Sequence, residues 1–184
     1  MNIHDYCRKS NKTEYPELIA SLQGKEIIFI GESRHSDPEQ ENNEKIIISE
    51  LTGPNKISIA IEDIFDEIYD SKRDMLLRFS HDGLFYLPVE TRQTVSMQSR
   101  QMAEVLPAIM ENGKITVVIV GSDHLVGTFT NDLGFLLRHF SSATIFLEEE
   151  FLGKDNLPVS GIYRRNTPAT RDHIIVGNLE SYMR

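Results

Sequence analysis

The sequence predicts a single α/β domain, residues 1–184, with a mostly parallel sheet flanked by helices and a C-terminal antiparallel hairpin at the sheet's edge. Three apolar runs, at residues 27–31, 57–61 and 115–120, are each followed by polar or titratable residues, as buried parallel strands often are. Helix-like segments alternate with these runs, which favours parallel strand connections. A length of 184 residues with 40% hydrophobic and 26% charged residues suits one globular domain with a sizeable core.

Local signals place the elements of the first half. Residues 15–22 predict a short helix with a proline in its first turn. A longer helix over residues 38–51 follows Ser36 or Asp37, either of which can cap it, and a Gly-Pro pair stops it. Signals then weaken: residues 66–79 fit a helix, and residues 84–89 fit a loop or short strand.

The second half repeats the alternation before it changes character. Residues 96–112 carry apolar positions at helical spacing, and Pro107 is expected to kink that helix. Residues 128–139 predict a further amphipathic helix, and residues 143–147 a fourth strand. The strand-like segments within residues 159–179 predict the edge hairpin, so the motif-bearing core covers about residues 26–147.

Composition limits the function classes. A formal charge of −9 and a pI near 5.1 argue against a nucleic-acid partner, which clustered Lys and Arg would bind. The amino terminus lacks the apolar core of a signal peptide, and no run approaches 18 apolar residues, so we expect no membrane association. Cys7 is the one cysteine and cannot form an internal disulfide, which fits a reducing compartment. A cytoplasmic protein is therefore expected.

The candidate functional groups follow three different strands. Glu32 and His35 lie three residues apart after the first strand, Glu62 follows the second, and His124 follows the third. Carboxyl ends of parallel strands meet at one edge, where ligands bind, so we expect these side chains to line one crevice. Together they suit a divalent cation such as Mn, Co or Zn. Without metal, the same groups suit general acid and base chemistry.

Each of these residues also has a structural interpretation. A lone histidine after a strand is more often a capping or core-edge residue than a catalyst, and Glu32 can serve to cap a helix. Glu62 ends a run that looks buried on both faces, where a carboxylate needs a partner. The convergence of three strand ends is what favours a functional site.

Four short motifs carry a resemblance to a known superfamily. They are Gly31-Glu-Ser-Arg-His35, Ile59-Ala-Ile-Glu62, Arg100-Gln-Met-Ala103, and the segment 117–127 ending in Gly-Ser-Asp-His-Leu-Val-Gly. In this order they resemble the superfamily that joins the Tiki/TraB proteins, the erythromycin esterases and the ChaN-type haem-uptake proteins. The similarity spans about residues 26–140. The first motif is similar to the esterase and haem-uptake branches, and the last to the Tiki/TraB branch.

The resemblance implies that Glu32, His35, Glu62 and His124 form a catalytic or metal-binding set with Arg100 close by. Chemistry differs between branches: metal-dependent peptide cleavage, lactone hydrolysis, metal-free peptide cleavage or haem carriage. We expect hydrolysis of an amide or ester bond in a small-molecule or peptide substrate, and the alternatives are a metal- or haem-binding module and a catalytically inactive interaction domain. Haem is the weaker cofactor, because haem iron needs an axial ligand in an apolar slot and this cleft is rich in acids.

Overall fold

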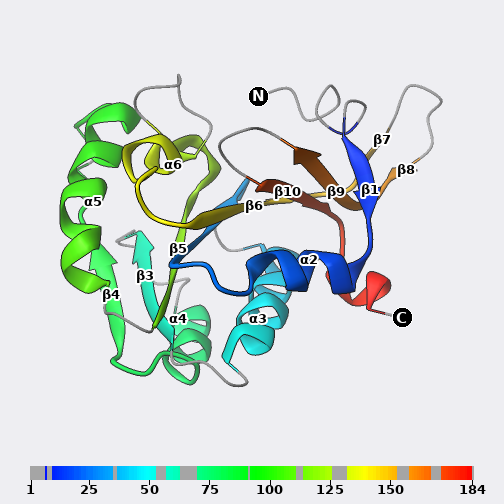
Figure 1. The fold of residues 1–184 in the computed structure, drawn as a ribbon, viewed down its shortest axis with the longest axis horizontal. Helices are drawn as coiled ribbons and strands as arrows, with labels where there is room; N and C mark the ends of the chain where they lie inside the picture. The colour runs from blue at the N-terminus through cyan, green and yellow to red at the C-terminus, as the bar shows by residue number, and fades with distance from the viewer. Residues whose placement is uncertain are drawn as a thin grey trace.

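The computed structural model describes residue 7 and residues 10–34, 37–52, 57–62, 70–90, 92–110, 114–125, 132–152, 158–166 and 171–183. These residues form an α/β fold in which helices cover both faces of one large sheet (Figure 1). The predicted fold class is confirmed.

The large sheet has eight strands in the order β1-β9-β10-β6-β2-β5-β3-β4. The bounds are β1 Asn11–Thr13, β2 Ile27–Glu32, β3 Ile57–Glu62, β4 Leu84–Leu87, β5 Ile115–Gly121, β6 Ser142–Glu148, β9 Gly161–Asn166 and β10 Arg171–Val176. Neighbouring strands from β10 to β4 pair in parallel, whereas β9 is antiparallel to both β10 and β1. A separate antiparallel pair joins β7 Phe151–Leu152 to β8 Pro158–Val159. All four strands predicted from the apolar runs are present.

The predicted C-terminal antiparallel hairpin is confirmed: β9 and β10 lie at the side of the sheet where the strands become antiparallel. β10 pairs in parallel with β6 on its other side, and β9 is covered by β1. Ile174, Ile175 and Val176 of β10 are fully buried, as suits a strand with a neighbour on each side. The outermost strand on this side is the short polar segment Asn11–Thr13, which carries Lys12, as protected edges commonly do.

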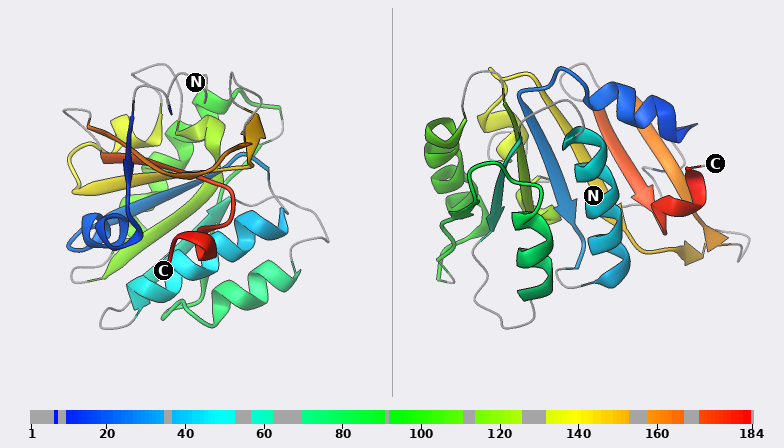
Figure 2. Two further views of the ribbon diagram at one scale, coloured as in Figure 1. Left: turned by 90° about the vertical axis from the view of Figure 1, so that its right-hand side faces the viewer. Right: turned by 90° about the horizontal axis from the view of Figure 1, so that it is seen from below.

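The helices lie in two layers. α2 Tyr15–Leu22, α3 Pro38–Thr52 and α4 Asp70–Leu77 cover one face, and α5 Val95–Ile109 and α6 Leu133–Leu136 cover the other (Figure 2). Asp37 caps α3, since its Oδ1 accepts hydrogen bonds from the amides of Glu39 (2.9 Å) and Gln40 (3.0 Å). No helix among the described residues is both long and apolar enough to cross a membrane.

Two predicted helices end earlier than expected, α4 at Leu77 and α6 at Leu136. α4 begins at Asp70, and residues 66–69 lie outside the described part of the chain. α6 spans four residues after its cap at Asp132, whose carboxylate accepts from the amide of Phe135 at 2.6 Å. α5 matches its prediction closely and continues past Pro107 to Ile109.

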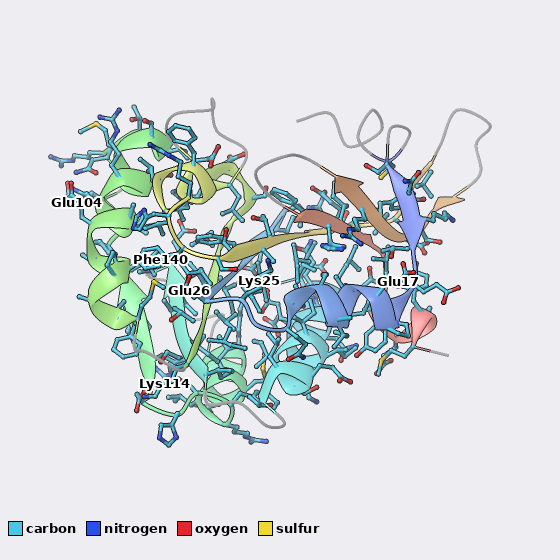
Figure 3. All side chains as sticks on the ribbon, viewed as in Figure 1. Glu17, Lys25, Glu26, Glu104, Lys114 and Phe140 are labelled. Carbon is cyan, nitrogen blue, oxygen red and sulfur yellow. The ribbon has the colours of Figure 1, made fainter. Side chains whose placement is uncertain are left out.

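Strand alternation divides the core between the two helical layers. Ile28 and Ile30 pack toward α3 and α4, whereas Phe29 packs toward α5 and α6. At the amino end of the sheet, Glu26 and Phe140 lie close together, as Figure 3 shows, and a Glu26 carboxylate oxygen accepts from the Ser141 amide at 2.7 Å. The polar groups that follow β2, β3 and β5 lie at the opposite side of the sheet, at the carboxyl ends of these strands, which we call the carboxyl edge.

Candidate functional site

The acids at the carboxyl ends of β2 and β3 face opposite sides of the sheet. Glu32 has the same parity as Ile30, which packs toward α3 and α4. Glu62 has the same parity as Ala60, which packs toward α5. Because side chains alternate along a strand, the two carboxylates leave one edge of the sheet in different directions. Each joins a separate group of polar side chains.

Glu62 belongs to a linear group with His124 and Ser99. Its Oε1 lies 3.3 Å from His124 Nε2, and its Oε2 accepts a hydrogen bond from the Gly121 amide at 2.8 Å. The other ring nitrogen, Nδ1, lies 3.0 Å from Ser99 Oγ. Both carboxylate oxygens of Glu62 are thus held by neighbouring groups. The group therefore orders a carboxylate, an imidazole and a hydroxyl in that sequence.

Exposure differs along this group. The Glu62 side chain is 10% exposed, the His124 side chain 4%, and Ser99 as a residue 1%. Glu62 is therefore the member that water or a small ligand reaches most readily. Its partners form a buried polar support that leads from the sheet edge into α5.

Gly31 allows this support to form. The segment carrying His124 is a 3-10 turn, η2 Ser122–His124, which follows β5 directly and packs on β2. A Cβ atom at Gly31 would lie 2.8 Å from Leu125 Cδ1 and 3.3 Å from Ser122 Cα. Glycine at the end of β2 therefore lets η2 approach closely enough for His124 to reach Glu62.

Glu32 belongs to a buried ionic cluster on the other face. The Lys72 ammonium, from α4, donates a hydrogen bond to Glu32 Oε1, and it lies 3.1 Å from the carboxylate oxygens of Glu44 on α3. All three residues are buried, and Glu44 is fully so. Among the contacts of the described residues, two acids share one base, so full ionisation of these three would leave one excess negative charge in the protein interior.

Burial favours a proton on one of the two acids of this cluster. Burial of Glu44, together with the nearby Glu32 carboxylate, raises the pKa of Glu44 well above its ordinary value, although Lys72 acts in the opposite direction. Burial alone would lower the pKa of Lys72, but the Glu44 and Glu32 carboxylates outweigh it and raise the pKa. Lys72 is thus a cation that pairs with one carboxylate, and the second carboxyl group stays protonated over a wider pH range than usual.

Four of the five predicted site residues are described by the structure, and two of these four are in contact. Glu62 and His124 are in contact, whereas Glu32 pairs with Lys72. Arg100 follows Ser99 on α5, but its side chain is exposed. His35 lies outside the described residues. We expected all of these side chains to line one crevice. Among the described residues, Glu62 and His124 form one pair, and Glu32 lies in a different cluster.

Three further polar residues of these groups were not predicted. Ser99 lies on the apolar face of α5, three residues before Met102 and seven before Leu106. Glu44 similarly interrupts the buried stripe of α3. A polar residue at a core position of an amphipathic helix is a detectable signal. Lys72 has no such signal, because the segment around it is weakly patterned.

The described members of the predicted metal set do not suit a shared ion. Glu32 is neutralised by Lys72, and Glu62 is held by a backbone amide and His124 on the other face of the sheet. Across the described ranges, no three His, Cys, Asp or Glu side chains are arranged to hold a metal. Comparison of the chain with protein-family models, with curated proteins and with solved structures finds no match.

Proposed function

We propose that this protein hydrolyses an amide or ester bond, with Glu62 as the base that activates water. The observation that carries the proposal is the Glu62 carboxylate itself, which is partly exposed at the carboxyl edge and is held by the Gly121 amide and the His124 ring. These contacts orient the carboxylate, as a general base must be oriented. The order of the four motifs, with their resemblance to hydrolytic families, supports the same reaction class.

In the proposed reaction, Glu62 accepts a proton from water as the water oxygen forms a bond to the substrate carbonyl carbon. The intermediate then collapses, the bond to the leaving oxygen or nitrogen breaks, and that atom takes the proton from Glu62. His124 is too buried to meet the substrate, so its role is to position Glu62 through the contact between Nε2 and the carboxylate. The substrate is a small molecule or a peptide.

No step of this proposal passes through a metal ion. The carboxylate of Glu32 is already paired with the Lys72 ammonium in the buried cluster with Glu44. Glu32 therefore has a structural role in this proposal and is not a metal ligand. A buried carboxylate paired in this way contributes mainly to how α3 and α4 pack on the sheet. Extensive dialysis against a chelator should therefore leave the hydrolytic rate unchanged.

The proposal is tested with chromogenic acyl esters and fluorogenic peptide amides of different charge. On any substrate that wild type hydrolyses, Glu62→Gln should reduce kcat by about 10²- to 10⁴-fold, the usual contribution of a general base. Glu104→Gln is the matched control, since Glu104 is an exposed acid on α5, labelled in Figure 3. Equal rates for the two variants would contradict the proposal.

A further inference from the structure

The Ser99 hydroxyl has one proton and two acceptors within reach. Its Oγ lies 2.9 Å from the Val95 carbonyl oxygen, one helical turn earlier, and 3.0 Å from His124 Nδ1. A hydroxyl can donate to only one of these at a time, but it can also accept. The protonation of the ring therefore decides which way the hydroxyl turns.

Two hydrogen-bond arrangements satisfy every heavy-atom position of the group. When the ring is neutral, His124 Nε2–H donates to Glu62 and Ser99 donates to Nδ1. When the ring is protonated, Nδ1–H donates to Ser99 Oγ, and the Ser99 proton turns to the Val95 carbonyl. In both, His124 Nε2 donates to Glu62, and no heavy atom moves.

Ser99 is not a nucleophile in this arrangement. It is 1% exposed, in the second turn of α5, and its own amide lies within the helical hydrogen-bond ladder. The residue types match a serine hydrolase triad, but the burial assigns Ser99 to positioning.

We propose that Ser99 is the positioning residue of the Glu62–His124 pair, because its hydroxyl binds the imidazole Nδ1 in both protonation states of the ring and keeps Nε2 directed at Glu62. This inference rests on the proposed function for its catalytic meaning. Its physical content is independent of turnover, because it concerns only the hydrogen bonding of His124.

The charged groups around the ring leave Ser99 as the partner of Nδ1. On β3 the Glu62 carboxylate faces Nε2, and on β2 Glu32 points to the other face of the sheet. On η2 itself Asp123 is exposed, and on α5 Arg100 is exposed. The hydroxyl and not a charged side chain is thus the group at hydrogen-bonding distance from Nδ1 among the described residues.

The test is an NMR titration of the His124 ring nitrogens and Cε1–H in the full chain, for wild type and Ser99→Ala. The variant removes the hydrogen bond to Nδ1 from both forms of the ring, and the protonated form loses more because a hydrogen bond to a charged group is the stronger one. Its proton-binding constant should therefore fall about fivefold to tenfold. Ser21→Ala is the matched control: Ser21 is a buried helical serine that donates to the Leu18 carbonyl at 2.6 Å, on a helix of the opposite layer.

Ser99→Cys supplies the second variant if the alanine variant does not fold, since a thiol has nearly the same volume but is a weak hydrogen-bond partner. A proton-binding constant within twofold of wild type in the folded variant overturns the inference, as does an equal change in Ser21→Ala. A lowered constant in a protein with no hydrolytic activity would support the positioning of His124 and contradict the proposed function. An unchanged constant in an active hydrolase would do the reverse.

Discussion

Replacing Lys72 with methionine should destabilise the protein strongly, because it removes the cation from a buried cluster. Methionine keeps much of the length of the lysine stem, so the main loss is the ammonium that pairs with Glu32 and Glu44. Removing one member of a buried ion pair costs about 3 to 5 kcal/mol. For a protein of this size, that corresponds to a lowering of Tm by about 6 to 20 °C.

The cost should depend on pH in a defined direction. In the wild type, the pKa of Glu44 is raised in the folded state, so its contribution to stability is full below the ordinary glutamate range and is lost as pH rises through the raised value. Without Lys72, both acids need protons to remain buried. The loss of stability in Lys72→Met should therefore be larger at pH 8 than at pH 5.

Urea unfolding followed by circular dichroism at pH 5 and pH 8 measures both quantities. Arg34→Met is the matched control, because Arg34 pairs with Glu149 at 2.8 Å on the same edge but the two side chains are 70% and 41% exposed. An exposed pair of this kind contributes about 1 kcal/mol or less. Lys72→Met as stable as Arg34→Met at pH 8 would refute the reasoning about the buried cluster.

Three further changes test neighbouring parts of the structure. Glu44→Gln removes the acid whose pKa is raised but leaves the Lys72–Glu32 pair. Urea unfolding should therefore show a stability equal to or above that of wild type at pH 8, and the stability should vary less between pH 5 and pH 8. A stability that varies more with pH would contradict this assignment. In Glu62→Gln, the new side chain presents its amide NH₂ to His124 Nε2, and its carbonyl oxygen accepts from the Gly121 amide. The neutral ring should therefore change to the Nδ1–H tautomer, which its ¹⁵N chemical shifts report, and Tm should stay within a few degrees of wild type. An unchanged tautomer would contradict this expectation. Gly31→Ala places a methyl group against Leu125 and the Ser122 backbone. It should lower the free energy of unfolding in urea by about 1 to 3 kcal/mol and shift the His124 resonances. If neither changes, η2 does not need this close approach.

The sheet was predictable because its central strands are apolar throughout. Burial is nearly continuous along four of them, β2, β3, β5 and β6. Runs of Ile, Val and Phe in the sequence predict such buried strands. The position of β10 was not predictable in the same way. Its sequence indicates a strand, but the strand with which it pairs, β6, is set by the arrangement of the whole sheet. Local sequence does not contain that information.

The candidate site was only partly predictable for a related reason. The sequence indicated that Glu32 and Glu62 end neighbouring parts of one sheet, and this is the edge at which both lie. Which face each acid takes depends on the register of β2 and β3 against β5, and continuous apolar runs do not reveal that register. The sequence alone therefore could not show that the two acids face different helices, as Ile30 and Ala60 do. The partners Ser99 and Lys72 come from helices, and their contacts depend on how those helices pack on the sheet.

The most direct test of the central claim compares Glu62→Gln with Glu32→Gln on one substrate that the wild type hydrolyses. Both variants neutralise an acid at the same edge of the sheet, but only Glu62 belongs to the proposed catalytic pair. We predict that Glu62→Gln lowers kcat/KM by about 10²-fold or more. Glu32→Gln should keep it within a few-fold, because Lys72 can then pair with an ionised Glu44. Equal losses in the two variants, or a larger loss for Glu32→Gln, would contradict the assignment of Glu62 as the base.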